Sequence, residues 1–79
     1  MKSLNECLEE RISLLESYEM AITASFIRSF IDKTAEEVEE AVGRIKNQIA
    51  KFELAKAYAE YLKANGLLKS TSKFYRYTR

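Results

Sequence analysis

The sequence predicts a mainly α-helical protein built around a long antiparallel helical hairpin. Two series of apolar residues recur at steps of three and four, which is the period of an amphipathic helix rather than of a strand. Each series follows a capping box, and none of the 79 residues is proline, so no residue forces a break. We expect helices over about residues 4–31 and 35–64, within one helical domain over residues 1–65.

The first helix is predicted to begin after Ser3. The Ser3 hydroxyl can accept from the amide of Glu6, whose carboxylate reaches back to the amide of Ser3. The apolar positions that follow are spaced by about 3.7 residues on average, as in a helix; they are Leu4, Leu8, Ile12, Leu15, Tyr18, Ile22, Phe26 and Phe30. Leu14, Met20 and Ile27 widen this series, so we expect the helix to contact more than one neighbour. The pair Asp32-Lys33 ends it.

The second helix is predicted to follow a capping box formed by Thr34 and Glu37. Its apolar positions have a mean spacing of about 3.4 residues, close to the repeat of a coiled coil; they are Val38, Val42, Ile45, Ile49, Phe52, Ala55, Ala59 and Leu62. Asn65-Gly66 predicts the end of this helix, because both residue types tolerate the left-handed conformation.

Helices of this length predict self-association. A helix of 30 residues is about 45 Å long, whereas a compact chain of this size has a radius of gyration of about 12 Å. A hairpin of two such rods leaves apolar residues exposed, and a chain this short sustains only a marginal core. We therefore expect a homodimer that forms a helical bundle, with these residues at its interface: Leu14, Met20, Ile27, Leu54, Tyr58 and Tyr61.

The last fourteen residues differ from the rest in charge. Residues 66–79 contain four cations and no acid, a net charge of +4, whereas residues 1–65 have a net charge of −3. Three of the nine aromatic residues, Phe74, Tyr75 and Tyr77, also lie here. This composition predicts either a short β-hairpin or a disordered basic tail.

Gly43 lies within the second apolar series and has two interpretations. It is either a glycine tolerated at a close helix contact, at a cost of roughly 1 kcal/mol, or a real break that gives helices 35–42 and 47–64. With a break, residues 34–78 resemble winged helix-turn-helix DNA-binding domains. The segments that carry the resemblance are TAEEV at 34–38 with the turn at Gly43, YLKANGLL at 61–68 and YRYT at 75–78. The resemblance implies that residues 66–79 form a wing.

The composition argues against catalysis. Histidine is absent, which removes the commonest general base, and a single cysteine without histidine makes no zinc site. Cys7 lies in the first apolar series, where a packed and inert thiol is expected. The glutamates at 36, 37, 39 and 40 are expected to form a solvated helix surface. We therefore expect no enzyme activity, no cofactor and no metal.

The same features bear on location. A lone cysteine fits a reducing compartment, and no apolar run approaches the ~18–20 residues of a membrane span. These observations predict a cytoplasmic protein that does not enter membranes.

Nucleic-acid binding has more support than catalysis, with DNA as the expected ligand and RNA as the alternative. No acid lies between Glu40 and Glu53, and this stretch contains the candidate contacts Arg44, Lys46, Asn47, Gln48 and Lys51. In a continuous helix Arg44, Gln48 and Lys51 share one face. In the winged interpretation this stretch begins the recognition helix, where Asn47 or Gln48 can pair with adenine and Arg44 with guanine or phosphate. The C-terminal cations Lys69, Lys73, Arg76 and Arg79 add phosphate contacts. The alternative is a structural or adaptor protein that docks a protein partner or forms a small subunit of a larger assembly.

Overall fold

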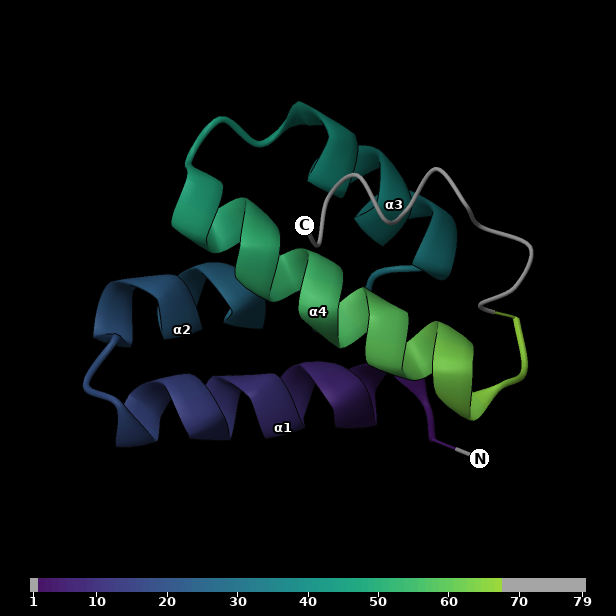
Figure 1. Ribbon diagram of the computed structural model, residues 1–79, viewed down its shortest axis with the longest axis horizontal. Helices are drawn as coiled ribbons and strands as arrows, with labels where there is room; N and C mark the ends of the chain where they lie inside the picture. Colours follow the sequence, from purple (N-terminus) through teal and green to yellow (C-terminus); the bar gives the residue numbers. More distant parts are fainter. Residues whose placement is uncertain (1, 68–79) are drawn as a thin grey trace.

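The computed structural model describes residues 2–67, which form four helices and no strand. They are α1 (Leu4–Ser17), α2 (Ala21–Arg28), α3 (Ala35–Arg44) and α4 (Gln48–Ala64). Helix α4 contacts each of the other three helices, and in Figure 1 it runs between α3 on one side and α1 and α2 on the other. The prediction of a mainly α-helical protein is confirmed. None of the described helices has the length and apolar character that crossing a bilayer requires.

Both predicted capping boxes are present. The amide of Glu6 donates to Ser3 Oγ at 3.1 Å, and the amide of Ser3 donates to Glu6 Oε1 at 2.9 Å. Thr34 and Glu37 repeat the arrangement with the same two distances, 3.1 and 2.9 Å. These hydrogen bonds lower the pKa values of both glutamate carboxyls. Two helix starts are therefore fixed by residues that are close together in the sequence.

The prediction of one continuous helix over residues 4–31 is wrong, because the chain turns at Tyr18–Met20. Glu19 adopts a left-handed conformation with φ of 60°. Its amide donates to the carbonyl of Glu16 at 3.0 Å, and the amide of Met20 donates to the carbonyl of Leu15 at 2.9 Å. This pattern is a Schellman motif, which ends a helix and satisfies its last carbonyls.

The second predicted helix, over residues 35–64, is also divided. Ile45 and Asn47 have extended backbones, with ψ of 131° and 113°, and helix α4 restarts after them. The Asn47 side chain caps the restart by accepting from the amide of Ala50 at 3.1 Å. Gly43 lies in the last turn of α3, where its poor helix propensity favours termination. The break therefore exists near Gly43, although later than the turn expected from the winged helix-turn-helix resemblance.

The predicted end of the last helix at Asn65-Gly66 is confirmed. Gly66 has φ of 69°, and the amide of Leu67 donates to the carbonyl of Leu62 at 2.8 Å. This is a second Schellman motif, here with the glycine that a left-handed position favours. The expected wing or tail beyond residue 67 lies outside the described residues, so the winged resemblance stays a prediction.

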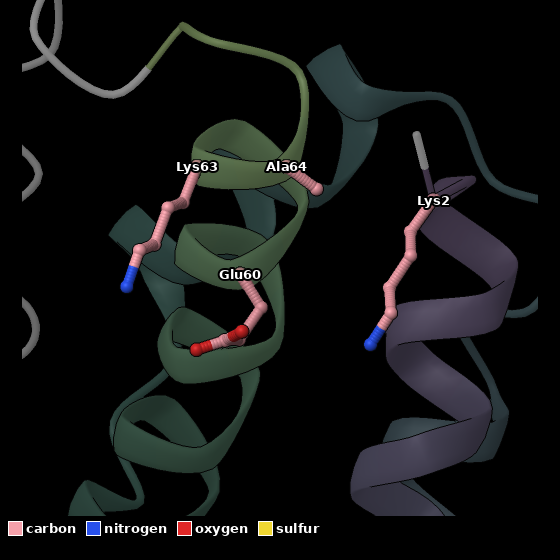
Figure 2. A pocket seen from close by; sticks show the side chains of 4 residues that line it. All are labelled: Lys2, Glu60, Lys63 and Ala64. Carbon is pink, nitrogen blue, oxygen red and sulfur yellow. The ribbon is translucent and has the colours of Figure 1, made fainter.

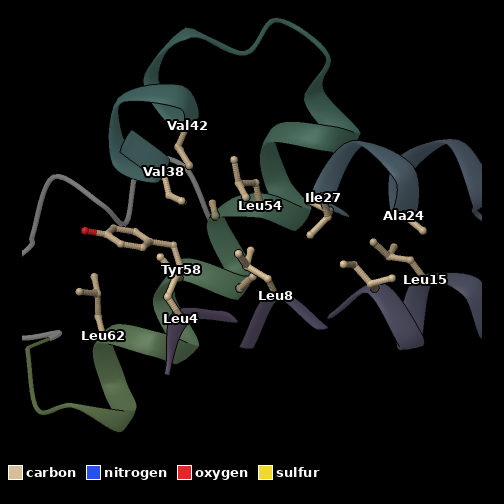
Figure 3. Close-up of a cluster of buried hydrophobic side chains, with 13 residues drawn as sticks. Leu4, Leu8, Leu15, Ala24, Ile27, Val38, Val42, Leu54, Tyr58 and Leu62 are labelled. Carbon is tan, nitrogen blue, oxygen red and sulfur yellow. The ribbon is translucent and has the colours of Figure 1, made fainter. Parts of the chain in front are cut away.

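The four short helices enclose one apolar core within a single chain (Figure 3). Leu8, Ile27 and Leu54 are fully buried, and Tyr58 is 4% exposed. The long axis of 33 Å is too short for rods of 45 Å. Because the two predicted helices are each divided, apolar residues that we expected at a dimer interface are buried within a single chain. The interface prediction is wrong for Ile27, Leu54 and Tyr58, since these residues pack against their own chain.

The other residues of that predicted interface lie nearer the surface. Leu14 is 38% exposed. Met20 and Tyr61 are half-buried against the core, and the ring of Tyr61 stacks on that of Tyr58 with 6.1 Å between centroids. Dimerisation itself stays a prediction, but the incomplete core from which we inferred it is not present.

Polar contacts fix how α4 lies on α1. Arg11 of α1 pairs with Glu53 of α4 at 3.3 Å, and both side chains are mostly buried. The side-chain amide of Asn65 donates to the carbonyl of Lys2 at 3.1 Å. The N-terminal end of α1 therefore lies beside the C-terminal end of α4, and the two helices run antiparallel (Figure 1). One side of α4 is held against the rest of the molecule.

Candidate nucleic-acid interface

One side of α4 faces away from the other helices. The inward side of α4 carries its buried residues, which are Ala50, Leu54, Ala55, Ala57, Tyr58 and Leu62. Residues three or four apart share a side of a helix, so the opposite side can be assigned from the sequence of α4. We call it the outer face of α4; it consists of Gln48, Ile49, Phe52, Lys56, Glu60 and Lys63.

The outer face combines apolar and cationic side chains. Gln48, Ile49 and Lys63 are exposed, and Phe52 and Lys56 are half-buried. The Lys56 ammonium lies over the Phe52 ring, 4.5 Å from its centroid, which is within the range of a cation–π interaction. This contact places a positive charge near the middle of the outer face. The apolar series had assigned Phe52 to the core, so the sequence missed this pair, although the spacing of four residues contained the signal.

Acidic residues are few on this face. Of the two acids in α4, Glu53 pairs with Arg11, and only Glu60 is exposed. No acid lies between Glu40 and Glu53. The last turn of α3, the turn at residues 45–47 and the start of α4 therefore contain no acid of their own, and we call them the acid-free corner; the Glu40 carboxylate lies beside it, paired with Arg44. Residues 1–65 have a net negative charge, so the distribution of cations, and not their number, distinguishes this corner.

The predicted contact residues at this corner have different roles in the structure. Lys46 and Gln48 are exposed. Asn47 is engaged as the N-cap of α4. Arg44 pairs with Glu40 at 3.7 Å on the surface of α3, and Lys51 is half-buried and makes an interaction within the protein.

The prediction that Arg44, Gln48 and Lys51 share one helix face is wrong. That spacing applies to a continuous helix, and the extended residues Ile45 and Asn47 separate α3 from α4. The exposed members of the predicted set that remain on α4 and its preceding turn are Lys46, Asn47 and Gln48, and of these Asn47 is held as the N-cap. The predicted contacts Lys69, Lys73, Arg76 and Arg79 lie outside the described residues.

The described residues contain neither an exposed thiol nor a cluster of potential metal ligands. Cys7 is 3% exposed, and burial raises the pKa of its thiol, so the reactive thiolate is disfavoured. No group of three potential metal ligands occurs among residues 2–67.

A depression between α1 and the end of α4 is lined by Lys2, Glu60, Lys63 and Ala64 (Figure 2). Lys63 extends away from Lys2 in this view, and the Lys2 ammonium pairs with Glu10 at 2.8 Å. The two cations therefore do not converge on a common anion.

Comparison with known proteins adds no assignment: no family model, curated protein or solved structure matches the chain. The outer face of α4 and the preceding turn are the candidate site on physical grounds alone.

Proposed function

We propose that this protein binds nucleic acid without catalysis, and that its ligand is duplex DNA. The observation that supports the proposal is the exposed, acid-free corner that continues into the outer face of α4. An α-helix with its side chains is about 10–12 Å across, and the major groove of B-DNA is about 12 Å wide. Since α1, α2 and α3 all pack on the inward side of α4, a groove can receive the outer face without unfolding the domain.

The cations are spaced to follow the walls of such a groove. Lys46 precedes α4, Lys56 lies near its middle and Lys63 lies in its last turn. The 17 residues of α4 correspond to a helix about 25 Å long, so the cations extend over several phosphates on each strand. Lysine contacts with phosphate supply affinity and orientation rather than sequence preference. In the winged interpretation, the four C-terminal cations add further phosphate contacts.

Fluorescence anisotropy of a labelled DNA duplex, measured over a series of salt concentrations, tests the proposal. The logarithm of the binding constant should fall linearly with the logarithm of salt concentration. Lys46→Ala and Lys56→Ala should each weaken binding and reduce the slope by about 1. Lys33→Ala is the matched control, because it removes an equal charge from an exposed position outside the corner and α4. Absence of binding at low salt, or equal effects of all three variants, would contradict the proposal.

A second candidate function is supported by a different surface. Leu14, Tyr18 and Ile22 are 38%, 64% and 88% exposed, and all three lie around the turn between α1 and α2. Exposed apolar side chains at one end of a small domain favour a protein contact, either with a second copy or with another protein in an adaptor role. Light scattering distinguishes self-association: a dimer mass that reverts to monomer in Tyr18→Ser with Ile22→Ser supports it. A monomer at all concentrations refutes the homodimer.

A further inference from the structure

We infer that Gln48 and Ile49 give this interface a preference for A·T base pairs read from the major groove. This inference rests on the proposed function and specifies its ligand. In it, the Gln48 side-chain amide pairs with an adenine, and the Ile49 side chain contacts the C5-methyl group of a thymine. Three observations lead to it: Asn47 is held as the N-cap of α4, Ile49 is exposed, and Gln48 and Ile49 both lie in the first turn of α4.

The structure distinguishes between two adjacent amide side chains. Asn47 and Gln48 both have the chemistry to form paired hydrogen bonds with adenine N6 and N7. The Asn47 carbonyl oxygen, however, accepts from the amide of Ala50 at 3.1 Å and thereby caps α4. Turning Asn47 toward a base would remove that cap, at a cost of about 1 kcal/mol. Gln48 is exposed at the first position of the helix, so its amide is the one that can meet a base.

Ile49 supplies an apolar contact at the same place. Its side chain is 57% exposed, although the neighbouring residues Lys46, Asn47 and Gln48 are polar and exposed. An isoleucine in this position covers none of the core and gains free energy when an apolar group removes it from water. Thymine presents the one methyl group that the four DNA bases expose in the major groove. The corner therefore matches A·T pairs in both its polar and its apolar contact.

The spacing along α4 is compatible with reading neighbouring positions. Residues in the first turn of a recognition helix contact base edges while cations farther along reach phosphates. Gln48 and Ile49 are separated by a rise of about 1.5 Å along the helix axis, less than one base-pair step of about 3.4 Å. Successive side chains leave the helix axis about 100° apart, so the two side chains suit two adjacent base pairs rather than a single one. Lys56 and Lys63, farther along α4, keep the sequence-independent role of the proposed function.

Three labelled duplexes of equal length test the inference: alternating A·T, alternating A·U and alternating G·C. Uracil retains every Watson–Crick hydrogen bond of thymine but lacks the methyl group. We expect binding in the order A·T, then A·U, then G·C, with a loss of about three- to fourfold for each methyl contact removed. Ile49→Ala should bind A·T and A·U duplexes equally. Gln48→Ala should lose the preference of A·U over G·C while still distinguishing thymine from uracil.

Comparison of each variant with the unmodified protein on the same duplexes removes differences in duplex shape from the result. Both substituted residues are exposed, and circular dichroism verifies that each variant is folded. Lys33→Ala should keep both preferences. If the protein binds all three duplexes equally, or if Ile49→Ala discriminates thymine from uracil as the unmodified protein does, this inference is refuted while the proposed function stands. Absence of binding to every duplex refutes the proposed function, and the base preference with it.

Discussion

Replacing Glu19 by glycine should stabilise the protein, although it removes a charged side chain and creates no contact. Glu19 is the residue that ends the first Schellman motif, with φ of 60°. In this conformation its Cβ atom is close to the following carbonyl oxygen, which costs roughly 1–2 kcal/mol for an L-residue. Glycine lacks the Cβ atom and adopts this conformation without strain.

The size of the gain follows from two opposing terms. Relief of the strain at Glu19 is worth about 1–2 kcal/mol, and the greater freedom of glycine in the unfolded chain costs roughly 0.5–1 kcal/mol. The side chain of Glu19 is exposed and makes no ion pair among the described residues, so little else is lost. The expected net stabilisation is about 0.5–1 kcal/mol. For a chain of this size, this corresponds to a rise in Tm of about 2–8 °C.

Urea denaturation followed by circular dichroism measures this difference, with Glu19→Ala as the matched control. Alanine removes the same carboxylate but retains the Cβ atom, so it should leave the stability almost unchanged. Asp32→Gly provides the contrast. Asp32 also has a positive φ, of 70°, but its carboxylate accepts from the side-chain amide of Asn5 at 2.9 Å, so the glycine variant should gain less. If Glu19→Gly and Glu19→Ala are equally stable, then backbone strain at residue 19 does not limit the stability of the protein.

Three further outcomes follow from the core, the break and the buried phenol. Leu54→Ala, at a residue with no exposed surface, should lower the free energy of unfolding by about 2–5 kcal/mol, measured by urea denaturation. Asn47→Ala should cost about 1 kcal/mol and Asn47→Ser much less, because serine also caps a helix; thermal melts separate the two. Tyr58 has a pKa raised from 10.0 to about 12, chiefly by burial. The folded protein should therefore lose stability as the pH rises above 10, and Tyr58→Phe should reduce that loss.

The sequence predicted the features of this fold that depend on neighbouring residues. Both capping boxes and the stop at Asn65-Gly66 are local hydrogen-bond patterns. The two interior breaks have weaker local signals. The turn at Glu19 has no glycine, and nothing nearby in the sequence marks a left-handed glutamate. The apolar spacing also continued unchanged across both breaks, although Tyr18, Ile22 and Ile49, members of the two series that lie beside the breaks, are exposed.

The sequence predicted the candidate site in part, and the helix breaks explain why the predicted and the observed site residues differ. The acid-free stretch was enough to select Lys46 and Gln48 as candidate contacts, whereas the role of Asn47 as a cap requires knowing where α4 begins. The sequence did not predict the contact between Lys56 and Phe52, because Phe52 belongs to the apolar series and was expected in the core. In the structure the series continues through residues on different sides of α4, so an apolar residue at the expected spacing need not be buried. Ile49 is the clearest case on α4, at 57% exposed.

The division of the second predicted helix connects the stability of this protein to its proposed interface. If α3 and α4 were one rod, Asn47 would lie within the helix and the residues beside it would follow a single straight surface. The extended residues Ile45 and Asn47 instead reverse the chain and leave a helix start at the surface. There Gln48 and Ile49 project from the first turn, ahead of Phe52 and Lys56. Because Asn47 holds this start by a hydrogen bond within the protein, the interface is organised before any ligand binds, and binding need not supply the free energy of ordering it.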